Sequence, residues 1–113
     1  MKNVCRYIDD HYAMDLKQSL LCTIAYMGKT KLKQCFKEKY DMTITEYIQR
    51  RRISIAEHML ISTRLKVSEV ARCVGYSSHS RFSALFKKYK GFSPQEFVEF
   101  VEDMKKSTQS FED

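Results

Sequence analysis

The sequence is short of turn-forming residues and has no long apolar run. Its 113 residues include three Gly and one Pro, too few for the tight turns that join the strands of a β fold. No apolar run approaches the ~20 residues that cross a bilayer, and no charged segment leads into an apolar core as in a secretory signal. We therefore expect an all-α, cytoplasmic protein with no membrane partner.

Cysteine is present, but not in a metal-binding pattern. The four cysteines form no C-x-x-C pair and have no His at ligand spacing; they are Cys5, Cys22, Cys35 and Cys73. This arrangement predicts reduced thiols and no metal site. The sequence also lacks a phosphate-binding loop, a nucleophile beside a base and a carboxylate pair, so we expect neither a cofactor nor an enzyme.

The charge is unbalanced toward the positive. Lys and Arg total 20 against 14 Asp and Glu, which gives a net charge of +6 and a pI near 9.2. A basic protein favours nucleic acid or an anionic membrane as a partner. A solvated basic surface would give the same balance, so the assignment depends on where the charges fall.

Two apolar stripes follow each other between residues 67 and 89. Positions i, i+3, i+4 and i+7 are apolar first at Val67, Val70, Ala71 and Val74, and then at Phe82, Leu85, Phe86 and Tyr89. Gly75 ends the first helix, because Gly enters left-handed conformations without steric cost. Two amphipathic helices joined by a short Gly-containing turn predict a helix-turn-helix unit.

An internal repeat indicates a second such unit. Residues 36–47 match residues 86–97 at an offset of 50, and upstream of the turn the offset is 49, as in Leu21 and Val70. Both copies run into a capping box, Thr43-x-x-Glu46 and Ser93-x-x-Glu96. We expect a first helix-turn-helix subdomain over residues 1–42, a linker helix over 43–61, a second subdomain over 62–107 and a frayed tail over 108–113. The Arg50-Arg51-Arg52 run should lie on or near a solvated face of the linker helix.

These segments resemble the AraC/XylS family of bacterial transcription regulators. The resemblance covers about residues 4–100 and is carried by residues 68–77, 82–88 and 91–97, and by Arg52-Ile53-x-x-Ala56. Residues 31–37 are similar to its siderophore-responsive PchR-like branch. The resemblance implies sequence-specific binding of double-stranded DNA for transcription regulation. It also implies seven helices, with helices 3 and 6 entering successive major grooves about 34 Å apart.

The same resemblance assigns roles to individual residues. The matching base-reading positions are Thr30, Lys33 and Gln34 in the third helix and His79, Ser80, Arg81, Ser83 and Ala84 in the sixth. The side chains suit this role: Gln34 fits adenine and Lys33 fits guanine in the third helix. In the sixth helix, Arg81 or His79 can donate to guanine, and Ala84 can contact only the methyl group of thymine. Phosphate contacts are expected from Lys29, Lys37, Lys87 and Lys88. A solvated face is the alternative reading for each Lys.

The first unit departs from the family pattern at two places. Tyr26 stands where the turn usually has Gly, so we expect either a positive φ or a reshaped turn. Gln18 replaces an apolar residue, which is Val67 in the second unit.

Two apolar residues, Leu20 and Ile24, should face solvent. With Met27 they suggest an alternative function, a helical module that docks another domain, another subunit or RNA polymerase, although scattered exposed apolar residues are ordinary. Expected partners are therefore DNA, RNA polymerase and an effector-binding domain. Because the chain opens directly with its first helix, we expect any such effector-binding domain to lie outside it.

Overall fold

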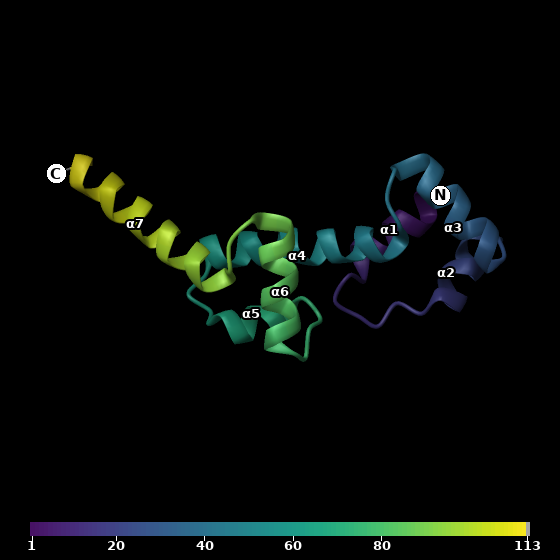
Figure 1. Ribbon diagram of the computed structural model, residues 1–113, viewed down its shortest axis with the longest axis horizontal. Helices are drawn as coiled ribbons and strands as arrows, with labels where there is room; N and C mark the ends of the chain where they lie inside the picture. Colours follow the sequence, from purple (N-terminus) through teal and green to yellow (C-terminus); the bar gives the residue numbers. More distant parts are fainter. Residues whose placement is uncertain (113) are drawn as a thin grey trace. The chain divides into compact units, whose positions relative to one another are not determined.

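The protein is built from helices throughout the residues that the structure describes (Figure 1). The computed structural model describes the backbone of residues 1–112 and the side chains of residues 1–106. The helices there are α1 (Lys2–Asp10), α2 (Gln18–Ala25), α3 (Lys29–Tyr40), α4 (Ile44–Ser62), α5 (Val67–Cys73), α6 (His79–Lys90) and α7 (Pro94–Glu112). The prediction of an all-α protein is confirmed for this part of the chain. None of these helices combines the length and the apolar character that crossing a membrane requires.

The chain divides into two compact units, and the boundary between them falls inside a helix. Unit 1 comprises Met1–Arg52 and unit 2 comprises Ile53–Asp113. The first part of α4 therefore belongs to unit 1 and the remainder to unit 2. The division into two subdomains and a separate linker helix stays a prediction.

Unit 1 gathers α1, α2 and α3 beside the first turns of α4 (Figure 1). Its buried core consists of Val4, Ile8, Leu21, Leu32 and Phe36. The Tyr47 hydroxyl donates a hydrogen bond to Asp9 Oδ1 at 3.0 Å and so ties α4 to α1. Burial raises the pKa of Tyr47, and this hydrogen bond raises it further. The pKa of Tyr40 rises to about 12, chiefly through a hydrogen bond with Cys5.

Unit 2 buries the two apolar stripes that the sequence analysis identified. Its core consists of Ile53, Ala56 and Leu60 from α4, Val70, Ala71 and Val74 from α5 and its end, and Phe82, Leu85 and Phe86 from α6. Val67 and Tyr89, the outer members of the stripes, are half-buried. Lys90 Nζ lies 2.7 Å from Glu57 Oε2, so an ion pair joins the end of α6 to α4.

The internal repeat is visible in both packing and backbone. The ring centroids of Phe36 and Tyr47 lie 5.6 Å apart, and those of their counterparts Phe86 and Phe97 also lie 5.6 Å apart. This aromatic pair fixes the end of α3 or α6 against the helix that follows it.

Each unit also reverses its backbone at the same two positions. Positive φ occurs at Tyr26 and Asp41 in unit 1, both 56°, and at Gly75 (100°) and Gly91 (92°) in unit 2. Tyr26 corresponds to Gly75, and Asp41 to Gly91. Of the two alternatives expected at Tyr26, a positive φ or a reshaped turn, the structure has the positive φ. Unit 1 therefore makes both turns with non-Gly residues, for which the left-handed conformation has a steric cost that is absent for Gly.

Side-chain caps start the helices as expected. Ser93 Oγ accepts from the Glu96 N–H at 3.1 Å, and the Ser93 N–H donates to Glu96 Oε1 at 3.3 Å, which completes a capping box. These hydrogen bonds hold the pKa of Glu96 below its usual value. In unit 1, Thr43 Oγ1 accepts from the Glu46 N–H at 3.0 Å. Ser78 Oγ accepts from the Arg81 N–H at 3.2 Å and caps α6.

Arg50 and Arg51 of the arginine run are exposed, and Arg52 makes contacts that the sequence analysis did not foresee. This side chain is half-buried and donates from Nε to the Tyr12 carbonyl at 2.6 Å and from Nη2 to the Met14 carbonyl at 2.8 Å. The planar guanidinium reaches two backbone acceptors at once and fixes the loop that leads into α2.

The predicted frayed tail, residues 108–113, falls partly beyond what is described. The backbone of α7 extends to Glu112. Residue 113 and the side chains of residues 107–113 lie outside the described residues.

Candidate nucleic-acid interface

The third helix of unit 1 has a polar face opposite its buried stripe. Leu32 and Phe36 are fully buried and determine which side of α3 faces the core. Thr30, Gln34 and Lys37 are exposed, and their i, i+4, i+7 spacing places them on one side of the helix. Lys29 is exposed in the first turn. The side chains predicted to read bases and to bind phosphate thus share the solvent side of α3.

The sixth helix repeats this arrangement in unit 2. Phe82, Leu85 and Phe86 face the core, and Ser83 is half-buried. The other predicted DNA-contacting residues of α6 are exposed, namely His79, Ser80, Arg81, Ala84, Lys87 and Lys88. The cap from Ser78 fixes the first turn, where His79, Ser80 and Arg81 lie.

The repeat reveals a residue that the sequence analysis did not select. At an offset of 50, Lys31 corresponds to Arg81, and both side chains are exposed. Comparing the two units position by position would have found it. Lys31 therefore joins the candidate DNA-contacting residues of α3.

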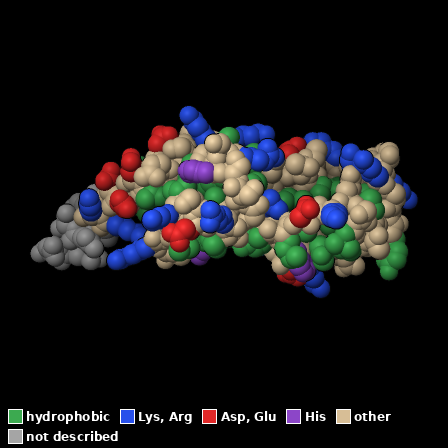
Figure 2. Space-filling view, turned by 90° about the horizontal axis from the view of Figure 1, so that it is seen from below, with side chains coloured by type: hydrophobic (Ala, Val, Ile, Leu, Met, Phe, Trp, Pro, Cys, Tyr) green, Lys and Arg blue, Asp and Glu red, His purple; other side chains and the backbone are tan. Residues whose placement is uncertain are grey.

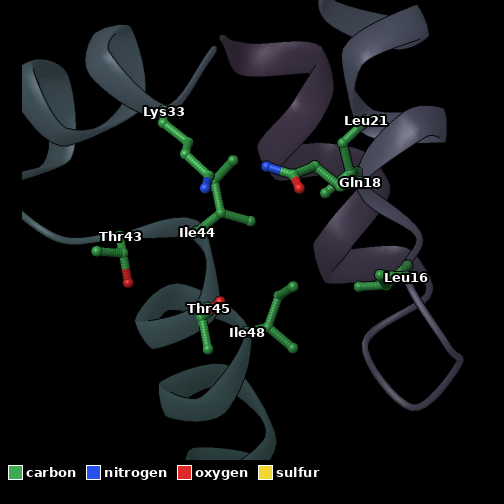
Figure 3. Close-up of a pocket in the computed structure, with 8 residues that line it drawn as sticks. All are labelled: Leu16, Gln18, Leu21, Lys33, Thr43, Ile44, Thr45 and Ile48. Atoms are coloured by element: carbon green, nitrogen blue, oxygen red, sulfur yellow. The ribbon is translucent and has the colours of Figure 1, made fainter. Parts of the chain in front are cut away.

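Two of the predicted base-reading side chains, Gln34 and Lys33, lie against other residues of unit 1. Gln34 Nε2 donates to Glu38 Oε1 at 3.3 Å, one turn further along α3. Lys33 is exposed, but it lines a pocket and its side chain extends toward Ile44 (Figure 3). A base contact by Lys33 requires its side chain to turn away from Ile44, whereas Gln34 keeps a second N–H donor and its Oε1 acceptor for a base.

Basic side chains dominate the ends of both helices. The last turns contain Lys37 and Lys39 in α3, and Lys87, Lys88 and Lys90 in α6. Cations at this end are stabilised by the helix dipole, so these positions also have a structural explanation. Lys88 Nζ lies 5.3 Å from the centre of the Tyr89 ring. Figure 2 shows Lys and Arg side chains distributed over the face of each unit that it draws.

The alternative docking surface is smaller than the sequence predicted. Leu20 is 40% exposed, as expected. Ile24 and Met27 are partly buried and pack against the core of unit 1. Tyr26 is 94% exposed and stands at the turn just before α3. The exposed apolar groups of this turn region are therefore Leu20 and Tyr26.

The described residues offer no obvious site for a metal ion. They contain no group of three or more His, Cys, Asp or Glu side chains placed to hold one. In each unit, a short helix is followed by a turn with positive φ and then by a helix with a polar, largely basic outer face. This fold and surface define a tandem helix-turn-helix protein.

Comparison with known proteins agrees with this class. Residues 21–99 match the helix-turn-helix domain family, and the chain belongs to that family as a DNA-binding domain of the AraC/XylS type with two helix-turn-helix units. The arabinose operon regulatory protein of Escherichia coli K12 is 30% identical over 98 residues, which are 86% of this chain and 34% of that protein. The PchR-like branch stays a prediction.

Solved structures show the same architecture. The C-terminal domain of AraT, a response regulator from Geobacillus stearothermophilus, is 26% identical, with a TM-score of 0.82 over 88% of this chain and 83% of that one. The DNA-binding domain of AdpA, a global transcriptional factor solved with a target DNA, is 19% identical, with a TM-score of 0.86 over 91% and 93%. At that identity the second likeness shows the fold alone. The chain spans less than half the length of curated relatives that it matches.

Proposed function

We propose that this chain binds double-stranded DNA in a sequence-specific way and thereby regulates bacterial transcription. The observation that carries the proposal is that α3 and α6, at equivalent places in two repeat-related units, both present exposed basic and hydrogen-bonding side chains. Membership of the AraC/XylS type of helix-turn-helix domain supports it. The mechanism is electrostatic docking on phosphates followed by base readout from the two helices, with no catalytic step. Because bacterial DNA lies in the cytoplasm, the proposal implies a cytoplasmic protein.

The residues divide into two roles. Base readout is assigned to Thr30, Lys33, Gln34, His79, Ser80, Arg81, Ser83 and Ala84, with Lys31 added from its equivalence to Arg81. Phosphate contacts are assigned to Lys29, Lys37, Lys87 and Lys88. Each helix would enter a major groove, where these groups meet base edges.

Selection from a randomised duplex library tests the proposal. We expect a bipartite motif bound about 10³-fold or more tightly than scrambled DNA, with half-sites about one helical turn apart. Enrichment of one half-site would mean that a single unit reads DNA. No enrichment together with a flat salt response would refute DNA binding.

Two single substitutions separate the assigned roles. Arg81→Ala should cost about 1–3 kcal/mol on the selected site and relax one base position. Lys87→Ala should weaken binding to all sequences alike and lower the salt slope by about one. Equal losses on specific and scrambled DNA for Arg81→Ala would contradict its base-reading role.

The second candidate is protein docking through the exposed side of α2. The exposure of two apolar side chains in this region, 40% for Leu20 and 94% for Tyr26, favours it. RNA polymerase and an effector-binding domain outside this chain are the partners that we propose for this surface. Leu20→Glu should impair regulation while DNA binding stays unchanged. Unchanged regulation in Leu20→Glu would remove the docking role.

A further inference from the structure

Unit 1 contains a cavity of about 390 Å³ beside α3. Its apolar lining is formed by Leu16, Leu21, Ile44 and Ile48, and its polar lining comes from Gln18, Lys33, Thr43 and Thr45. In Figure 3 the Gln18 amide and the Lys33 ammonium extend toward the middle of the cavity, from α2 and α3 respectively. A mostly apolar hollow with a few convergent polar groups is the usual form of a small-molecule site.

Because unit 2 has the same fold as unit 1, its equivalent positions indicate which of the lining residues the fold requires. The apolar lining is preserved in unit 2, where Leu65, Val70 and Val98 correspond to Leu16, Leu21 and Ile48. The polar pair is not preserved. Val67 stands in place of Gln18, and Ser83 in place of Lys33.

Unit 2 forms the same helix-turn-helix without either side chain. Lys33 and its counterpart Ser83 are both assigned to base readout, so DNA contact already accounts for Lys33, and Gln18 is the side chain that neither packing nor DNA contact explains. An amide at this position buries less apolar surface than the Val of unit 2. A ligand that uses Gln18 together with Lys33 would account for the amide.

We propose that this cavity binds a small monocarboxylate with an apolar body. The carboxylate would accept hydrogen bonds from the Lys33 ammonium and the Gln18 amide, and a charge-assisted bond of this kind is stronger than a neutral one. The apolar body would lie against Leu16, Ile44 and Ile48. Among the described residues, Lys33 is the one cationic side chain that lines the cavity. A single cation beside apolar side chains suits a singly charged acid with an apolar body better than a phosphate, which carries more charge and has no apolar part.

Ligand binding would also oppose DNA binding, and this part rests on the proposed function. Lys33 is one of the residues assigned to base readout. A bound carboxylate would form an ion pair with the Lys33 ammonium and so keep it from contacting a base. Because coupling between two sites is reciprocal, DNA would weaken the ligand by the same factor. Unit 1 would thus respond to a metabolite directly.

In the binding test, 4-phenylbutyrate is titrated into the whole chain without DNA. Binding is measured from the changes in NMR chemical shifts of the protein. We expect saturable shifts at the residues that line the cavity, with a Kd of about 1 mM or tighter. The neutral 4-phenylbutyramide should bind at least roughly tenfold more weakly, because it lacks the charge. Lys33→Gln and Gln18→Val should each lose roughly tenfold or more of the affinity. Gln18→Val introduces the residue that unit 2 already uses, so folding should be retained, and its circular dichroism spectrum checks this.

Lys37→Gln is the matched control, since it removes an exposed lysine of the same helix outside the cavity. It should bind 4-phenylbutyrate as the wild type does. Absence of shifts, equal binding of the amide, or equal losses in Lys37→Gln and Lys33→Gln would overturn the proposed site.

DNA binding is measured separately by fluorescence anisotropy on the selected duplex. Saturating 4-phenylbutyrate should raise the Kd for DNA in the wild type and leave it unchanged in Gln18→Val. Ligand binding without any change in DNA affinity would overturn the antagonism and leave the site standing. Failure to bind DNA without ligand would count against the proposed function, and the NMR result would still decide the site.

Discussion

Replacing Tyr26 with Gly should stabilise the protein. Tyr26 has φ 56° and ψ 40°, and the left-handed conformation costs an L-residue about 1–2 kcal/mol. Its side chain is 94% exposed, so removing the ring loses almost no buried area. The greater freedom of Gly in the unfolded chain offsets about 0.5–1 kcal/mol of the gain. We therefore expect a net stabilisation of about 0–1.5 kcal/mol, centred near about 0.75 kcal/mol, and a rise in Tm of up to roughly 8 °C.

Urea and thermal unfolding followed by circular dichroism would measure this change, and two further variants control it. Asp41→Gly, also at φ 56°, should gain less because Asp tolerates the left-handed region better than Tyr. Gly91→Ala should lose about 1 kcal/mol, because its φ is +92°, although no atom lies within 4 Å of the added Cβ. A lower urea midpoint for Tyr26→Gly would refute the reasoning, since it would show that the ring contributes more than its backbone costs.

Three other substitutions or conditions test contacts described above. Arg52→Ala should destabilise unit 1 by about 1–3 kcal/mol, because two backbone carbonyls lose a charged donor, and Arg52→Lys should recover only part of this in urea unfolding. Ser93→Ala should cost about 1 kcal/mol through loss of the α7 cap, whereas Ser93→Thr should cost less, and equal losses would argue against capping. The raised pKa values of Tyr40 and Tyr47 mean that the folded state favours the neutral phenols. Stability from them is present below pH 10.0, the ordinary value, and is lost as pH rises toward about 12. The drop in urea midpoint over this range should be smaller in Tyr47→Phe.

The sequence predicted the elements and the repeat well, because those depend on local patterns. The stripe spacing in unit 2 identified the buried faces of α5 and α6, and the boxes at Thr43 and Ser93 identified two helix starts. The presence of Tyr26 where unit 2 has Gly limited the turn to two alternatives, a positive φ or a reshaped turn, and the structure has the first.

What the sequence could not predict are the interactions between distant residues. Arg52 reads as part of a charged run, yet its partners are carbonyls at residues 12 and 14, about forty positions away. Ile24 occupies a nominally outward position on α2 but packs partly against the core of unit 1, because helix periodicity does not specify how widely neighbouring helices cover a face. The cavity beside Lys33 likewise depends on side chains from α2, α3 and α4 together with the loop residue Leu16.

The two left-handed turns of unit 1 also affect local unfolding. Two units with the same design differ in backbone strain, because one uses Tyr and Asp where the other uses Gly. The amide hydrogens of α2 and α3 should therefore exchange with solvent through smaller opening free energies than those of α5 and α6. A ligand that binds only the closed form raises the opening free energy of a contacted segment by the same amount whatever its starting value. Because the amides of unit 1 exchange sooner without ligand, the protection given by an operator or a small ligand should be seen at shorter exchange times in unit 1 than in unit 2.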